Sequence, residues 1–175
     1  MFLLFQGFNS FGQLKSEIFK DLLKNTYQYS KPRIVNKVDS VTVEYHLKRL
    51  IEKQNRTFFA EIDESKDSIN GIQLTPTEKE FLIKSIRKQY KNEWKKEDFD
   101  EYQIITFDES VNYLKSSEKN TLVEISNPIF IRDNKIAFIY FANLCCGKYG
   151  RADLSFYRKE NGIWKMWISV SSVHF

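Results

Sequence analysis

The sequence predicts a single α+β domain in which N-terminal helices pack on a C-terminal, antiparallel, meander-like and curved sheet of about four to five strands. Three observations predict this fold class. Apolar residues recur at helical spacing early in the chain, and from Leu122 onward they alternate with the period of two that is typical of strands. An Asn161-Gly162 pair near the end marks a tight hairpin. A length of 175 residues suits one domain rather than two.

The first part of the chain, residues 1–12, resembles the end of a secretory signal peptide. It is apolar, has no charged side chain and ends in Ser10-Phe11-Gly12, whose small residues suit a signal peptidase that cuts before Gln13. The basic segment that normally precedes such a stretch is missing, so the alternative is an ordinary hydrophobic N-terminus that packs on the domain. In the first case residues 13–175 form an exported domain, periplasmic or secreted; in the second the protein is cytoplasmic. No other stretch approaches the roughly 20 apolar residues of a membrane span, so none is expected in the mature chain.

Helical periodicity and one capping motif predict the helices. Residues 14–29 carry apolar side chains every three or four positions, and Pro32 ends this helix. Residues 34–55 combine a strand-like and a helical pattern, and we expect a helix over residues 40–54. Thr75-Pro76-Thr77-Glu78 places a hydroxyl at the N-cap, proline at the first helical position and a carboxylate two residues later, so a helix begins at this point. A further helix is expected after Asp108.

Alternating apolar residues predict the strands. Two short strands are expected among the helices, at residues 57–62 and 103–107. The last third contains five more, at residues 122–126, 129–132, 136–144, 152–159 and 163–170. Asp133-Asn134 predicts one hairpin turn and Asn161-Gly162 another, because both residues of a type I′ turn must tolerate positive φ. The second turn sets Lys159 opposite Trp164, Tyr157 opposite Met166 and Phe156 opposite Trp167.

The strand predicted at residues 136–144 is apolar on both faces as far as Asn143. An antiparallel strand usually exposes one face to water, and polar residues then alternate along it. Because this strand is apolar on both faces, we expect both to be covered, by helices or another segment of this chain, by a second copy of the chain or by an apolar ligand. This predicts a non-catalytic domain that binds a protein partner or a small apolar ligand through an aromatic sheet face and the adjoining loop. The candidate binding residues are Tyr140, Phe156 and Trp167 on the sheet and Cys145, Cys146, Tyr149 and Arg151 in the loop.

Catalytic and metal-binding patterns are missing from the sequence. Adjacent Cys145 and Cys146 do not suit a disulfide between them and lack further ligands for a metal. Glu61 and Asp63, two apart on a predicted strand, are a carboxylate pair of low specificity. His46 and His174, the two histidines, have no recognisable nucleophile partner. We therefore expect no metal, cofactor or assigned catalytic residue.

The charge of the chain argues against a nucleic-acid partner. Lys and Arg exceed Asp and Glu by a net +4, but acidic groups are interleaved throughout instead of leaving a basic stripe. The same aromatic sheet face could instead meet a second copy of the chain and form a homodimer.

The closing hairpin, residues 156–166, resembles the final hairpin of uncharacterised exported bacterial proteins and of cone-shaped NTF2-like domains. The resemblance covers this hairpin alone, and Cys146-Gly147 retains only the first half of a Cys-Gly-x-x-Cys-Gly loop of some of those exported proteins, which puts a disulfide there in doubt. An NTF2-like fold would imply helices on a strongly bent sheet that encloses a pocket, used for binding or catalysis, and it carries over no catalytic residue. A pocket enzyme is therefore the alternative function. A cavity over Tyr140, Phe156 and Trp167 that contains Glu61, Asp63, His46 or Asp153 would favour it.

Overall fold

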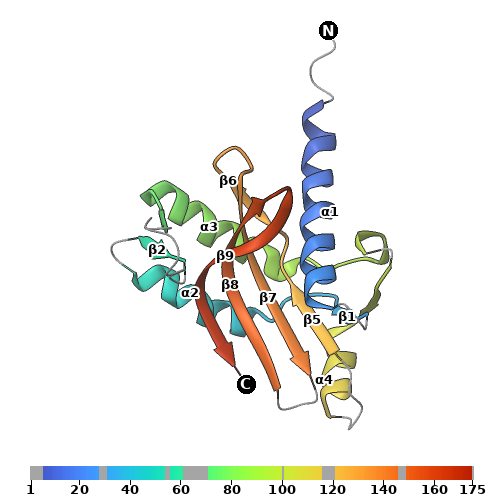
Figure 1. Ribbon diagram of the computed structural model, residues 1–175. Helices are drawn as coiled ribbons and strands as arrows, with labels where there is room; N and C mark the ends of the chain where they lie inside the picture. Colours follow the sequence, from blue (N-terminus) through green and yellow to red (C-terminus); the bar gives the residue numbers. More distant parts are fainter. Residues whose placement is uncertain are drawn as a thin grey trace.

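The computed structural model describes residues 6–27, 31–53, 56–60, 71–99, 101–115, 121–145 and 149–174, without the side chains of residues 6–11, 25, 26, 145 and 149. Within these residues lie four α-helices and nine strands (Figure 1). The helices are α1 (Gln6–Thr26), α2 (Ser40–Glu52), α3 (Pro76–Lys88) and α4 (Phe107–Lys115). The strands are β1 (Arg33–Val35), β2 (Thr57–Phe59), β3 (Gly71–Gln73), β4 (Gln103–Ile105), β5 (Thr121–Ile125), β6 (Ile129–Ile131), β7 (Ile136–Cys145), β8 (Tyr149–Glu160) and β9 (Ile163–His174).

The main sheet has seven strands, in the order β4-β1-β5-β7-β8-β9 with β6 also paired to β7. The α+β class is confirmed, but the prediction of a purely antiparallel sheet of four to five strands is wrong. Strand β1 runs parallel to both β4 and β5, so the sheet is mixed, while the β5-β7-β8-β9 part is antiparallel. The predicted strand at residues 57–62 forms a separate hairpin of β2 with β3.

Two helices begin at capping side chains, whereas α1 begins at Gln6 and not at residue 14 as expected. The Asp39 carboxylate accepts hydrogen bonds from the Val41 and Thr42 amides and begins α2. At α3, Thr75 Oγ1 accepts the Glu78 amide at 3.1 Å, and Glu78 Oε2 accepts the Thr75 amide at 2.8 Å. This reciprocal capping box, with Pro76 at the first position, confirms the predicted start of the helix.

Both predicted hairpin turns are present. Asn161 and Gly162 have φ values of 53° and 80°, as a type I′ turn between β8 and β9 requires. Lys159 lies opposite Trp164 and Tyr157 opposite Met166, as predicted, but Phe156 lies opposite Ile168 and not Trp167. The register shifts between Phe156 and Tyr157 and again between Leu154 and Ser155. Such bulges bend a strand, and β9 contacts α2 as well as α1.

Strands β5 and β6 both lie along the same edge of β7. β5 pairs with the C-terminal half of β7 and β6 with its N-terminal half. In the interruption between them, the buried Ser126 amide donates to the Tyr140 carbonyl at 3.0 Å, and Ser126 Oγ accepts the Tyr140 amide at 2.9 Å. A serine thus satisfies the backbone of β7 where the neighbouring strand is broken.

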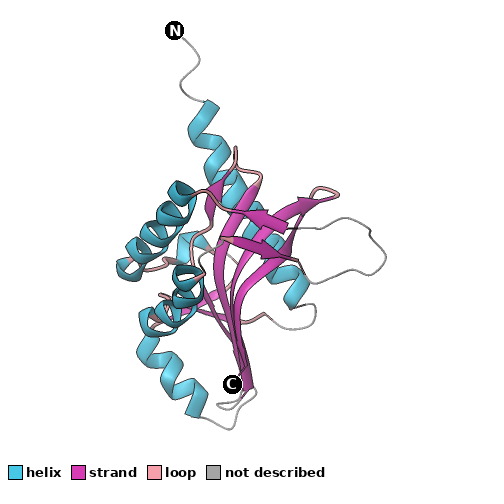
Figure 2. Ribbon diagram, turned by 90° about the vertical axis from the view of Figure 1, so that its left-hand side faces the viewer, coloured by secondary structure: helices cyan, strands magenta, loops and turns pink. Residues whose placement is uncertain are grey.

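Helices cover both faces of the sheet. Figure 2, turned by 90° from Figure 1, shows the sheet between helices α2 and α3 on one side and α1 on the other. We call these the α2 face and the α1 face. The α2 face buries one alternate set of strand residues under α2 and α3, including Phe138, Tyr140, Leu154, Phe156 and Ile168. The α1 face buries the other set beside α1, including Val123, Ile139, Phe141, Tyr157 and Trp164.

Strand β7 is therefore covered on both faces, which confirms the expectation from its continuous apolar sequence. All its residues from Ile136 to Ala142 are at most 9% exposed. Two adjacent turns of α1 contribute Ile18, Phe19, Leu22 and Leu23, each nearly or fully buried. A segment of this chain thus supplies the second cover over much of the strand.

Candidate functional site

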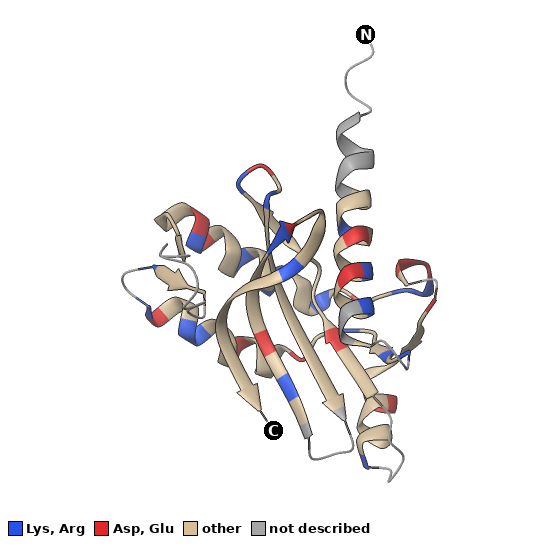
Figure 3. Cartoon of the chain, viewed as in Figure 1, with Lys and Arg blue, Asp and Glu red and all other residues tan. Residues whose placement is uncertain are grey.

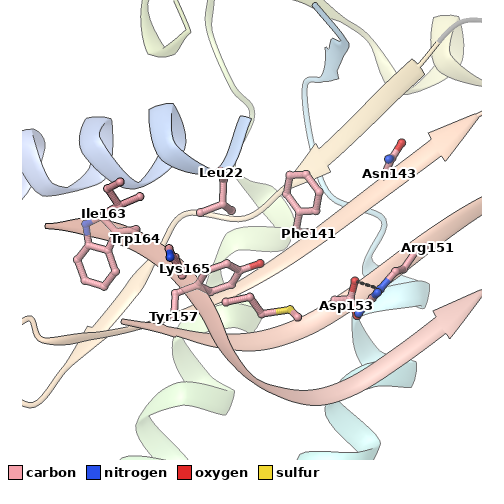
Figure 4. A pocket seen from close by; sticks show the side chains of 10 residues that line it. Leu22, Phe141, Asn143, Arg151, Asp153, Tyr157, Ile163, Trp164 and Lys165 are labelled. Atoms are coloured by element: carbon pink, nitrogen blue, oxygen red, sulfur yellow. Dashed lines mark hydrogen bonds and ion pairs between the residues drawn. The ribbon is translucent and has the colours of Figure 1, made fainter. Parts of the chain in front are cut away.

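A groove of about 530 Å³ opens on the α1 face, beside α1 and over strands β7, β8 and β9 (Figure 4). We call it the α1 groove. Its volume lies within the usual range for small-molecule sites. The residues that line it are Leu22 of α1, Phe141 and Asn143 of β7, Arg151, Asp153 and Tyr157 of β8, and Ile163, Trp164, Lys165 and Met166 of β9.

The strand register brings the floor of the α1 groove together. Phe141 lies directly opposite Asp153, Asn143 opposite Arg151, and Tyr157 opposite Met166. Alternation along each strand points these side chains to one face. Phe141 and Tyr157 are buried, whereas Met166 is 48% exposed. The groove therefore has an aromatic floor and a flexible apolar rim.

One end of the α1 groove is polar. Arg151 Nε donates to Asp153 Oδ2 at 2.7 Å, and Asp153 is only 7% exposed (Figure 4). The second carboxylate oxygen, Asp153 Oδ1, is buried and accepts no hydrogen bond from the described residues. The same holds for Asn143 Oδ1. Two buried acceptors at one end thus lack donors, which is costly unless another molecule supplies them.

The opposite end of the α1 groove is formed where α1 is attached to the β8–β9 hairpin. Figure 4 shows Ile163, Trp164 and Lys165 there, away from Asn143, Arg151 and Asp153. The Trp164 amide donates to Asp21 Oδ2 at 2.8 Å, and Lys159 Nζ pairs with Glu17 Oε2 at 2.7 Å. These bonds, together with the burial of Trp164, hold α1 in place as one wall of the groove.

Between the two ends, the hydroxyl of Tyr157 is the additional polar group. Burial raises the pKa of Tyr157 well above its usual value, and the Asp153 charge raises this pKa further. The tyrosine is therefore neutral at physiological pH and can donate or accept a hydrogen bond.

Comparisons of the chain with protein families, with curated proteins and with solved structures find no match. The resemblance of the closing hairpin to NTF2-like and exported bacterial proteins stays a prediction. The described residues include no helix long and apolar enough to cross a membrane. Among those same residues, no three His, Cys, Asp or Glu side chains come together in a group that could hold a metal ion.

The predicted binding residues are divided between the two faces of the sheet. Tyr140 and Phe156 are 1% and 0% exposed on the α2 face, and Trp167 packs against the same core with the Arg158 guanidinium 4.6 Å from its ring centre. Of the predicted residues whose side chains are described, Arg151 alone lines the α1 groove. Cys146 lies outside the described residues, as do the side chains of Cys145 and Tyr149; Glu61 and Asp63 are outside them too.

Asp153, named from the sequence as an ionisable group that would favour a pocket enzyme, also lines the α1 groove. The other residues of the groove were not selected as a site from the sequence, although the hairpin register contained a signal for them. A turn at Asn161-Gly162 puts Tyr157 and Met166 on one face, and alternation adds Asp153 and Arg151 to it. Phe156 belongs to the opposite face. Grouping residues by strand parity would have separated the two sets and selected the correct partners for Arg151.

A second buried polar cluster lies on the α2 face. Glu124 is 5% exposed and accepts the Asp39 amide at 3.1 Å. Burial raises the pKa of Glu124 to about 7, partly offset by the Asp39 amide and the Tyr140 hydroxyl. Fully buried His46 stacks edge-on to Tyr140, with ring centres 5.7 Å apart. Burial lowers the pKa of His46, and the Asp153 charge and the Ser171 backbone oppose this.

Charged side chains elsewhere are mixed in sign. In the part of the chain that Figure 3 colours, Lys and Arg alternate with Asp and Glu over helices and strands alike. Several are paired, including Arg87 with Glu44 at 2.7 Å and Arg132 with Glu78 at 2.9 Å. This distribution offers phosphate no extended basic surface among the coloured residues.

Proposed function

We propose that this protein is a non-catalytic binding domain and that it takes a small, mainly apolar molecule into the α1 groove. The observation that carries the proposal is the pair of buried acceptors, Asp153 Oδ1 and Asn143 Oδ1, at one end of an aromatic-floored groove. A few polar groups that converge at the edge of an apolar pocket are typical of ligand sites. The ligand's apolar part lies over Phe141 and Tyr157, and a donor group meets the two oxygens.

The alternative, a pocket enzyme, has less support from the arrangement of these residues. His46 lies on the α2 face, so the sheet separates it from the α1 groove. His174 shares the α1 face, opposite Arg151, but no hydrogen bond joins it to Asp153 in the described part of the chain. The Asp153 carboxylate bonds instead to Arg151, an arrangement that suits recognition better than proton transfer.

Titration with octanol, which combines an apolar tail with one donor, tests the proposal. Two-dimensional amide NMR spectra should shift at Phe141, Tyr157 and Met166 and stay unchanged at buried residues of the α2 face. Met166→Lys places a charge in the apolar part of the groove and should weaken binding by about tenfold or more, because the bound tail would desolvate the ammonium.

Phe81→Lys is the matched control for this experiment. Phe81 lies on α3 and is 49% exposed, against 48% for Met166, so both changes introduce the same charge at a similarly exposed apolar site. The control should bind octanol as the unchanged protein does. Equal weakening in both variants, or shifts confined to the α2 face, would contradict a ligand site in the α1 groove.

A further inference from the structure

The polar groups at one end of the α1 groove restrict the chemistry of the ligand more than the volume of the groove does. Asp153 Oδ1 and Asn143 Oδ1 are both acceptors, and neither receives a hydrogen bond from the described residues. A carboxylate oxygen accepts only, so the missing partner must donate. Asn143 lies opposite Arg151, and Asp153 follows Arg151 by two residues on the same face of β8. Asn143 and Asp153 are therefore diagonal neighbours across the two strands.

We infer that the ligand of the α1 groove is a primary amine, bound as its ammonium ion between Asp153 and Asn143 with its hydrocarbon part over Phe141 and Tyr157. This inference rests on the proposed function and specifies the ligand's head group. One ammonium carries three N–H donors on a single atom and therefore satisfies both oxygens together. A hydrogen bond from a cation to a carboxylate is roughly twice as strong as one between neutral groups.

The aromatic floor supports a cationic head group independently. Phe141 lies opposite Asp153, and Tyr157 lies four residues beyond Asp153 on the same face of β8. The faces of aromatic rings attract cations, and more strongly where water is excluded. Both rings are at least nine-tenths buried, so an ammonium beside Asp153 lies next to a largely desolvated aromatic surface.

The positive side chains of the α1 groove do not favour an anionic ligand instead. Arg151 is bound through Nε to Asp153 Oδ2 at 2.7 Å, so a ligand carboxylate at this end would compete with Asp153 for the guanidinium and be repelled by the Asp153 charge. Lys165 lies at the other end of the groove (Figure 4). A carboxylate would also add a third acceptor beside Asp153 Oδ1 and Asn143 Oδ1, which receive no hydrogen bond from the described residues.

Three ligands with the same tail separate these head groups: octylamine, octanol and octanoate, titrated by calorimetry into the full chain at one pH. Octylamine should bind about tenfold more tightly than octanol, since a charged hydrogen bond replaces a neutral one, and octanoate should bind most weakly. Asp153→Asn keeps the shape of the side chain and removes its charge. In this variant the ratio of the affinity for octylamine to the affinity for octanol should fall to about one, while octanol still binds.

Two further variants make the comparison decisive. Asn143→Asp adds a second carboxylate beside the head group and should increase the preference for octylamine several-fold. Asp108→Asn, at an exposed position in the first turn of α4, is the matched control and should leave the preference unchanged. An amine that binds no better than the alcohol, or a preference that survives Asp153→Asn, would overturn the inference. Failure of all three ligands to bind would instead overturn the proposed function.

Discussion

Glu124 is a carboxyl group whose environment differs sharply from water. It is 5% exposed under the N-terminus of α2, and its Oε2 accepts the amide of Asp39, the residue that caps the helix. Burial raises the pKa of Glu124 from an ordinary value of 4.5 to about 7. The folded protein therefore keeps a proton that the unfolded chain releases between these two pH values.

This proton makes stability fall as pH rises. Between about pH 4.5 and pH 7 the folded state binds more protons than the unfolded state, so the free energy of unfolding decreases with pH, by about 3 kcal/mol over the whole interval. Below the lower value both states hold the proton, and the stabilisation is complete. Above the higher value both have lost it, and the curve is flat with respect to this group.

Glu124→Gln removes the titration and retains an acceptor for the Asp39 amide. Urea unfolding at several pH values gives the free energy of unfolding of both proteins. The value for the variant, relative to that for the unchanged protein, should rise by about 3 kcal/mol between about pH 4 and pH 8. The difference between the two proteins isolates Glu124 from His46, whose lowered pKa acts with the opposite sign. Glu80→Gln, on the exposed side of α3, is the control, and its free energy of unfolding should change with pH as that of the unchanged protein does. If the free energy of unfolding of Glu124→Gln also followed that of the unchanged protein at every pH, Glu124 would not be the group that titrates.

At the scale of elements, the β8–β9 hairpin depends on its turn. Gly162 has a φ of 80°, and no atom lies within 4 Å of the position where a Cβ would be added. Gly162→Ala should therefore cost about 1 kcal/mol through backbone conformation alone. Gly162→Asn should cost less, because asparagine tolerates this conformation better. The urea midpoints of the two variants measure these losses of stability. Equal losses in Gly162→Ala and Gly162→Asn would show that contacts, and not the backbone φ, determine the effect.

The elements that the sequence predicted are those with a local signal. The capping box at Thr75 and the Asn161-Gly162 turn depend on residues within a few positions of each other, and both are present. Strand β1, in contrast, has three residues and lies in the ambiguous stretch before α2. Its pairing with β4 and β5 joins segments some 70 to 90 residues away, so the residues around it carry no sign of its partners.

The bulges in β9 limited the prediction of the site in the same way. Register counted outward from the turn holds as far as Tyr157 and Met166 and is then displaced by one residue at Trp167. β9 contacts both α1 and α2, which are far from it in the sequence, and such long-range packing cannot be read from the residues around the turn. Counting therefore gave Phe156 the wrong cross-strand partner, although Trp167 packs on the α2 face with Phe156 as the count implies. Arg151 and Asp153 lie on β8 and are assigned to the α1 face by alternation alone.

At the scale of the whole molecule, β1 links the two halves of the fold. Ile34 is fully buried and pairs with Ile104 on one side and Val123 on the other. It belongs to the same core as Ile18, Phe19 and Leu23 of α1. Residues 6–105 thus do not simply cover a sheet made by residues 121–174; they contribute two of its strands, β1 and β4, and the helix that walls the α1 groove.

The first twelve residues bear on where this domain begins. No atom lies within 4 Å of a Cβ added at Gly12, and the described contacts of α1 with the sheet come from Leu14 onward, through Ile18, Phe19, Leu22 and Leu23. Deletion of residues 1–12 leaves all of these side chains, together with Glu17 and Asp21, which bond to Lys159 and to the Trp164 amide.

The shortened chain 13–175 keeps these described contacts and should therefore fold with nearly unchanged stability, within about 0.5 kcal/mol by urea unfolding. Deletion of residues 1–23 removes the buried side chains as well and is the contrasting variant. Loss of four large apolar groups should cost at least about 6 kcal/mol, enough to unfold a domain of ordinary stability. If the shorter deletion were as damaging as the longer one, residues 1–12 would be part of the core rather than a removable extension, and the prediction that the domain begins at Gln13 would be wrong.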